Sequence, residues 1–105
     1  MKQTHVITLT SQHVGEWPAE WVNSFLARLR LWGDCKGADS RIVWVMEVQR
    51  DGRQHAHVAF SLPRGALIPV AEFTRWWPHG HFAVFKRLDA HAQVIARCGR
   101  GWVRA

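Results

Sequence analysis

The pattern of apolar and polar positions predicts that this chain begins with a strand and continues into a helix. Residues 4–10 (THVITLT) alternate and are rich in β-branched side chains, as is typical of a half-buried strand. Pro18 fits the first position of a helix that runs to about Trp32, where Gly33 can end it. Six apolar residues recur along this segment at helical spacing and predict one buried stripe: Trp21, Val22, Phe25, Leu26, Leu29 and Trp32.

The centre of the chain, residues 41–62 (RIVWVMEVQRDGRQHAHVAFSL), has the pattern of a β-hairpin. Residues 42–48 and 55–62 are apolar or alternating runs, and the Asp51-Gly52 pair between them is a turn signal. Successive residues of a strand point to opposite sides of a sheet. The length of the loop therefore decides which side chains share a face.

Two loop lengths give different faces. A two-residue loop at Asp51-Gly52 would put Glu47 on the face away from His55 and His57. A three-residue loop ending in a left-handed Gly52 instead places Glu47 opposite His55. We favour the three-residue loop because it also gathers the apolar residues on the other face: Ile42, Trp44, Met46, Val48, Ala56, Val58, Phe60 and Leu62.

The C-terminal third predicts a helix, a strand and a last helix. Residues 69–77 (PVAEFTRWW) form a short helix stopped by Pro78, and residues 79–86 (HGHFAVFK) form a strand. Asp89 is a suitable N-cap for a helix over residues 90–98. The order strand, helix, hairpin, helix, strand, helix predicts an α+β fold in which helices pack on an antiparallel sheet.

Composition limits the kinds of protein that this chain can be. With 105 residues and 48% hydrophobic content, residues 1–105 are expected to fold as a single domain with its own core. Cys35 and Cys98 lack metal-site or redox-motif spacing, which favours free thiols in a reducing compartment and hence a cytoplasmic protein. No apolar run approaches the ~18 residues that cross a bilayer, so no membrane partner is expected.

The charge balance points to a polyanionic partner, and nucleic acid is the leading candidate. The net charge is +6 and the pI is about 10.7. Trp17, Trp77 and Trp102, in predicted loops or at sheet edges, are candidates to stack on unpaired bases. Candidates for contacts to phosphate are Arg41, Arg50, Arg53, Arg64, Lys86, Arg87, Arg97, Arg100 and Arg104.

The predicted hairpin also carries a candidate metal site. His55 and His57 lie two residues apart and project from one face of their strand, and Glu47 lies across the ladder. Two imidazoles and a carboxylate make a three-ligand site for a divalent cation with open coordination positions. The alternative is that these are polar side chains on a solvated face.

Three stretches resemble the HUH endonuclease superfamily, the rolling-circle replication initiators of plasmids and filamentous phages. Residues 6–10 (VITLT) resemble its first motif, and residues 55–60 (HAHVAF) resemble its second. Residues 77–98 look like the region that leads to the third. The resemblance implies a ferredoxin-like or RRM-like sheet that binds single-stranded or hairpin DNA. It also implies a divalent ion, usually Mg or Mn, with Zn as an alternative, on His55, His57 and Glu47.

The sequence departs from that family where the nucleophile is expected, because it contains no tyrosine. The helix that should carry Tyr-x-x-Lys has Val94 or Cys98 at the nucleophile position, and Arg97 stands where the helper lysine is expected. Covalent nicking through tyrosine is therefore excluded for this chain alone.

Several hypotheses for function remain open. We favour a binder of single-stranded or hairpin DNA that has lost strand transfer. The alternatives are phosphodiester hydrolysis by metal-activated water on Glu47, His55 and His57, or Cys98 as a substitute nucleophile. An RRM-like RNA-binding module and a protein-interaction domain are rivals from other classes.

Overall fold

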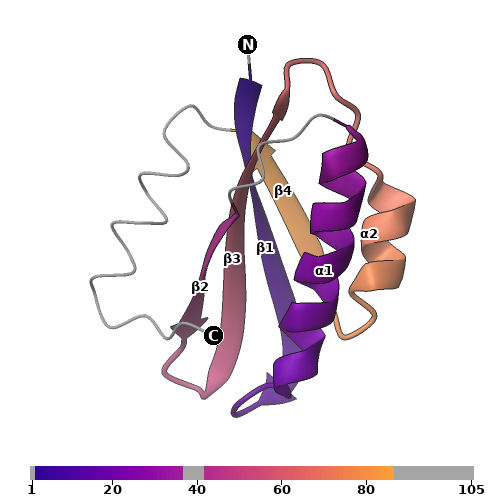
Figure 1. Cartoon of the computed structure of the whole chain (residues 1–105). Coiled ribbons are helices and arrows are strands. Elements are labelled where there is room, and N and C mark those ends of the chain that lie inside the picture. The colour runs from indigo at the N-terminus through magenta and orange to yellow at the C-terminus, as the bar shows by residue number, and fades with distance from the viewer. Residues whose placement is uncertain (1, 37–41, 87–105) are drawn as a thin grey trace.

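The computed structural model describes residues 2–36 and 42–86, which form one sheet and two helices (Figure 1). The elements are β1 (Lys2–Val14), α1 (Ala19–Cys35), β2 (Val43–Val48), β3 (Arg53–Pro63), α2 (Val70–Trp76) and β4 (Phe82–Lys86). The strands lie in the order β2-β3-β1-β4, and all neighbouring pairs are antiparallel. This element order is that of the ferredoxin-like arrangement. The predicted α+β fold with an antiparallel sheet is confirmed, while the predicted helix over residues 90–98 lies outside the described residues.

Both helices pack on the same face of the sheet, and the hydrophobic core lies between them and the strands. Alternate residues of the two central strands point into it, as the period of two requires. The buried core residues on the strands are Ile7, Leu9, Met46, Ala56, Val58, Phe60 and Leu62, and those on the helices are Val22, Phe25, Leu26, Leu29 and Phe73. The opposite face of the sheet is therefore left to side chains that the core does not use.

The β2–β3 hairpin has the three-residue loop that we favoured from the sequence. The Gln49 amide donates to the Arg53 carbonyl oxygen at 2.8 Å, and the Gly52 amide donates to the Gln49 carbonyl oxygen at 3.0 Å. Gly52 has a φ of 85°, which is the left-handed conformation that this loop requires. The resulting register pairs Glu47 with His55. The predicted register is confirmed.

Helix α1 carries the predicted stripe but does not end at Gly33, so that part of the prediction is wrong. The helix continues to Cys35, and Gly33 is buried within it. Gly33 lies four residues after Leu29 and so continues the buried side of the helix. Packing of this last turn offsets the ~1 kcal/mol that a glycine costs inside a helix. Neither described helix is long and apolar enough to cross a membrane.

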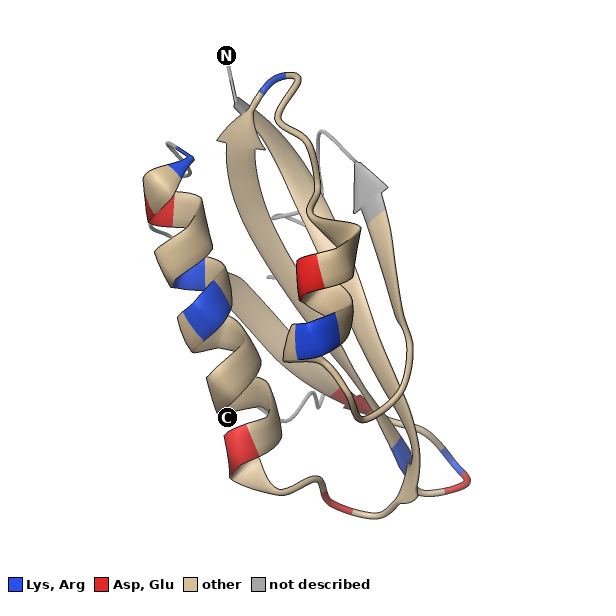
Figure 2. Ribbon diagram, turned by 90° about the vertical axis from the view of Figure 1, so that its right-hand side faces the viewer, with Lys and Arg blue, Asp and Glu red and all other residues tan. Residues whose placement is uncertain are grey.

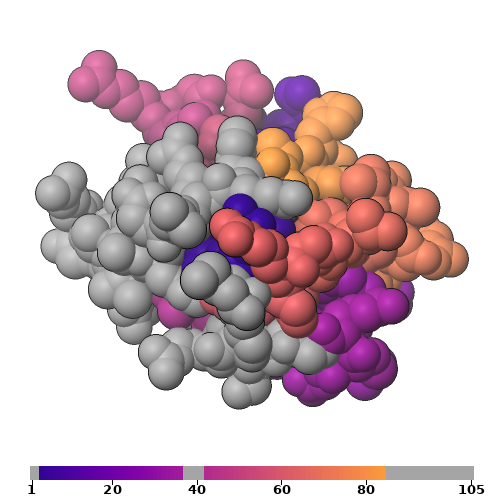
Figure 3. Space-filling view, turned by 90° about the horizontal axis from the view of Figure 1, so that it is seen from above, coloured from indigo at the N-terminus to yellow at the C-terminus, as the bar shows by residue number. Residues whose placement is uncertain are grey.

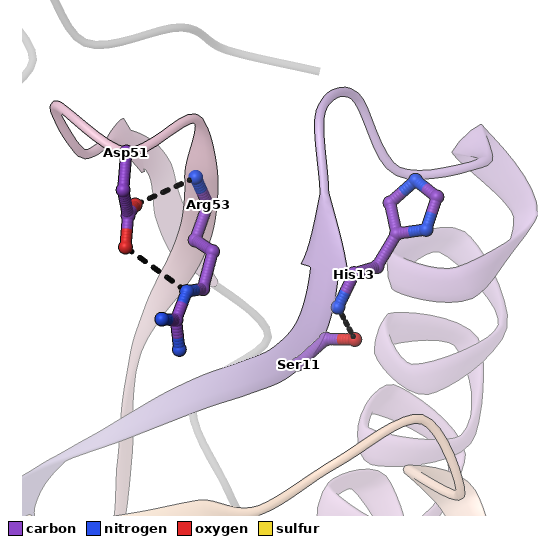
Figure 4. A network of polar contacts seen from close by, with 4 residues as sticks. All are labelled: Ser11, His13, Asp51 and Arg53. Atoms are coloured by element: carbon purple, nitrogen blue, oxygen red, sulfur yellow. Dashed lines mark hydrogen bonds and ion pairs between the residues drawn. The ribbon is translucent and has the colours of Figure 1, made fainter.

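Strand β1 is longer than its alternating pattern suggested, and it covers part of the stretch that we expected to be a loop. Its pairing with β3 is irregular between Thr10 and Val14. Ser11 Oγ accepts a hydrogen bond from the His13 amide at 3.1 Å (Figure 4). Such a local side-chain bond withdraws a backbone amide from the ladder, which is consistent with the irregularity at this point.

The connection from α2 to β4 is longer than predicted, because β4 starts at Phe82 and not at His79. The intervening residues cross the end of β1. A Cβ atom added at Gly80 would lie 2.8 Å from Ser11 Cα, so only glycine fits between these two backbones. The close crossing is what delays the start of the strand.

Candidate functional site

The face of the sheet opposite α1 and α2, which we call the histidine face, carries the side chains that the sequence singled out. Two rows run across the central strands. In one, Glu47 pairs with His55 and His55 pairs with Thr10; in the other, His57 pairs with Thr8. All five side chains are half-buried. The three-residue loop is the local feature that brings Glu47 to this face.

The three predicted metal ligands share this face without being drawn together. The ring centroids of His55 and His57 lie 6.5 Å apart, with an interplanar angle of 74°. Within residues 2–36 and 42–86, no three His, Cys, Asp or Glu side chains form a group that could hold a metal ion. Metal binding by Glu47, His55 and His57 therefore stays a prediction that the register supports.

His57 is held at the border between the polar and apolar parts of the face. A hydrogen bond of 3.1 Å joins its Nδ1 to Thr8 Oγ1 on β1. Next to this row, Val45 and Ala59 are fully buried and form a small second cluster with Val6. No pattern in the sequence indicated the Thr8 contact, because the neighbour of β3 in the sheet could not be identified before the strand order was known.

Thr10, the β1 neighbour of His55, joins the sheet to the α2–β4 connection. Its amide and its Oγ1 donate to the His81 carbonyl oxygen at 2.9 and 3.1 Å. Its own carbonyl oxygen accepts a hydrogen bond from Trp77 Nε1 at 2.9 Å. The position beside His55 is thus fixed by a segment that the sequence analysis treated as a simple turn.

The comparison with protein families connects this face to a known class. The family model described as a replication-associated protein of the ORF2 type matches residues 4–98, most of the chain. The chain belongs to this replication-associated protein family. No curated protein and no solved structure matches it.

Membership of the replication-associated protein family supports a replication-related role and agrees with the resemblance to rolling-circle replication proteins. The match includes β1, with the VITLT stretch, and the hairpin that carries both histidines. It also extends over Val94, Arg97 and Cys98, which lie outside the described residues.

The described arginines of this replication-associated protein do not form one patch. Arg50 and Arg53 lie at the hairpin tip, whereas Arg64 follows the far end of β3 (Figure 2). Strand β3 has 11 residues, which at ~3.3 Å per residue separates its ends by roughly 35 Å. Viewed from above, the β3–α2 connection that contains Arg64 lies at the surface (Figure 3). Lys86 is the last residue of β4, and the candidates outside the described residues are Arg41, Arg87, Arg97, Arg100 and Arg104.

At the hairpin tip, Arg53 is tied to Asp51. Arg53 Nε lies 3.0 Å from Asp51 Oδ2, and the Arg53 amide donates to Asp51 Oδ1 at 3.0 Å (Figure 4). The backbone hydrogen bond from Arg53, together with its positive charge, lowers the pKa of the Asp51 carboxyl below its ordinary value. The exposed Arg50 guanidinium is therefore the better placed of the two tip arginines to meet a phosphate.

Two tryptophans that we expected to stack on bases are core residues, so that expectation is wrong for them. Trp17 and Trp77 are only 5% and 1% exposed. Their rings pack on each other with centroids 5.0 Å apart, and Trp21 lies against both. Burial among other aromatic rings leaves neither ring a face for a base. Trp102 lies outside the described residues.

The same aromatic cluster holds His79. Its ring stacks on Trp21 with centroids 4.0 Å apart and an angle of 4°, and its other aromatic neighbour is Trp77 at 5.0 Å. Burial lowers the pKa of His79 below its ordinary value, and the negative charge of Glu20 opposes this shift. His13 packs edge-on against Trp21 at 5.6 Å. The neutral imidazole is therefore the form that this cluster favours.

Proposed function

We propose that this replication-associated protein binds single-stranded or hairpin DNA through the histidine face, with a divalent cation held by Glu47, His55 and His57. The observation that carries the proposal is the hairpin register, which places the carboxylate and both imidazoles on one side of the sheet. Membership of the replication-associated protein family adds a replication-related setting. The exposed thiol of Cys35 fits a reducing, cytoplasmic location.

The donor set suits a divalent cation, although its side chains must turn to meet one. When two imidazoles bind the same ion at ~2.1 Å, their ring centroids lie roughly 5 Å apart. The observed separation of His55 and His57 is 6.5 Å, so a rotation of half-buried side chains closes the difference. Both histidines lie on one strand and Glu47 lies on its partner, so no backbone rearrangement is needed. A bound cation there would polarise a phosphate oxygen of the DNA.

We propose further that the chain is an HUH-type domain that binds DNA without forming a covalent link to it. The nucleophile of that superfamily is a tyrosine, and this sequence has none. Three protein ligands leave coordination positions for water, which keeps hydrolysis by a metal-activated water as the alternative. The ferredoxin-like topology is shared with RNA-binding modules, so the test must also include RNA.

The test measures the affinity of the full chain for labelled single-stranded, hairpin and duplex DNA and single-stranded RNA, across a salt series with and without Mn²⁺. We expect tightest binding to single-stranded or hairpin DNA, with an affinity that falls steeply as salt rises. Mn²⁺ should raise both the affinity and the melting temperature, and His57→Ala should abolish both effects. His13→Ala is the control, because His13 is exposed and lies outside the histidine face.

Three results would reject parts of the proposal. Equal, weak binding to all four nucleic acids would reduce it to a charge effect, and preferential binding of RNA would replace it with the RNA-binding alternative. No response of either wild type or His57→Ala to Mn²⁺ would remove the cation. Cleavage of the labelled DNA that depends on Mn²⁺ and on His57 would favour hydrolysis over simple binding.

A further inference from the structure

We propose that Thr8 is a positioning residue that fixes the ring of His57 so that its Nε2, and not its Nδ1, is the nitrogen that coordinates the cation. This inference rests on the function proposed above. Thr8 and His57 are direct cross-strand neighbours on the two central strands. Thr8 Oγ1 and His57 Nδ1 are 3.1 Å apart and hydrogen-bonded.

The chemistry of imidazole gives this bond a direction once a cation is present. A neutral imidazole carries one proton, and the nitrogen that binds a metal must be the one without it. If His57 coordinates through Nε2, its proton is on Nδ1, and Nδ1–H donates to Thr8 Oγ1. The Thr8 oxygen thus stabilises the tautomer that leaves an electron pair on Nε2. Groups that bind the second nitrogen of a metal-bound histidine commonly have this role.

The surroundings of Thr8 favour this partnership. Its other cross-strand neighbour is Ala83, which has no polar side-chain atom to compete for the hydroxyl. Threonine is also β-branched, so its χ1 has few alternatives and the oxygen is held in place. Thr8 is only half-buried, but it lies on a central strand whose backbone is paired on both sides. The oxygen is therefore preorganised before any ligand binds.

Thr10 provides an internal comparison, because it occupies the same face of the same strand. Its hydroxyl donates to the His81 carbonyl oxygen at 3.1 Å and not to its cross-strand neighbour His55. Removing the Thr10 hydroxyl should weaken the α2–β4 connection and leave the tautomer of His57 unchanged. The two threonines thus separate a general loss of stability from a specific effect on the histidine.

The experiment compares Thr8→Val, Thr8→Ser and Thr10→Val with the wild type. Mn²⁺ affinity is measured by titration calorimetry, and the tautomer of His57 in the metal-free protein is measured from its ¹⁵N chemical shifts. We expect wild-type His57 to carry its proton on Nδ1, and Thr8→Val to lose this preference. Thr8→Val should bind Mn²⁺ about 10- to 100-fold more weakly, whereas Thr8→Ser, which keeps the oxygen, should stay near the wild type.

Each part of the result bears on the inference. Wild-type His57 protonated on Nε2, or Thr8→Val with wild-type Mn²⁺ affinity, would overturn it, as would an equal loss of affinity in Thr10→Val. If the wild type binds no Mn²⁺, the proposed function fails, while the tautomer measurement still decides whether Thr8 sets the proton position. If Thr8→Val does not fold, Thr8→Ser and the wild-type tautomer carry the test.

Discussion

Replacement of Gly80 by alanine is the sharpest test of how the α2–β4 connection is joined to the sheet. An added Cβ would lie 2.8 Å from Ser11 Cα and 2.9 Å from the Thr10 carbonyl carbon. These are backbone atoms of a central strand, so they cannot move aside as a flexible side chain would. Gly80 is not among the glycines with positive φ, so the expected cost is steric and not conformational. The connection must move away from β1.

The magnitude follows from the hydrogen bonds that this movement breaks. The Thr10 amide and hydroxyl lose the His81 carbonyl oxygen, and Trp77 Nε1 loses the Thr10 carbonyl oxygen. At ~1 kcal/mol each, three bonds contribute about 3 kcal/mol, and a buried Trp77 N–H left without an acceptor adds about 1 kcal/mol more. Alanine restricts the unfolded chain and returns at most ~1 kcal/mol. The net loss in the free energy of unfolding is therefore about 3 kcal/mol.

The matched control is Gly65→Ala in the β3–α2 connection. Gly65 has a φ of 86° and no atom within 4 Å of an added Cβ, so only left-handed strain of about 1–2 kcal/mol is expected. Urea unfolding of both variants gives the comparison. Since ~1 kcal/mol shifts the melting temperature of a domain this size by roughly 4–8 °C, Gly80→Ala should melt more than ~10 °C below the wild type. A loss no greater than that of Gly65→Ala would refute the close crossing.

Two further predictions concern buried groups near the first helix. Gln54→Leu removes the Oε1 that accepts the buried Trp17 amide at 2.7 Å, so it should cost about 1–3 kcal/mol in urea unfolding, whereas Gln49→Leu on the exposed loop should cost under ~0.5 kcal/mol; equal losses would contradict the bond. For His79, the folded pKa lies below the ordinary value of 6.5, so its contribution to stability is complete above that pH and is lost as the pH falls through the lowered pKa. The wild type should therefore lose stability relative to His79→Phe on acidification below pH 6.5, and parallel pH profiles would contradict the stack on Trp21.

The parts of the fold that the sequence predicted are those set by local geometry. The Asp51-Gly52 turn and the alternation on both sides of it were enough to choose the loop and so to put Glu47 opposite His55. The buried stripe of α1 follows in the same way from helical spacing. In both cases the information lies within a dozen residues of chain.

The parts that were missed depend on contacts between distant segments. Gly33 was expected to end α1, but its burial on the core side continues the helix. Trp17 and Trp77 were expected in exposed loops, and they are buried because the first loop and the α2–β4 connection meet at one end of the sheet. The role of Thr8 could not be seen either, because it requires knowing that β1 lies next to β3.

The hairpin is fastened at its turn to the segment that leads into α1. The Gly15 amide donates to the Gly52 carbonyl oxygen at 2.8 Å, and Gln54 accepts from the Trp17 backbone. A peptide of the hairpin alone would lack both anchors and would be marginally stable at best in water. The arrangement of Glu47 beside the two histidines is consequently a property of the whole assembled domain. It could not be grafted onto another protein as a short cassette, and any cation that selects it would draw its affinity partly from the folding of the entire chain.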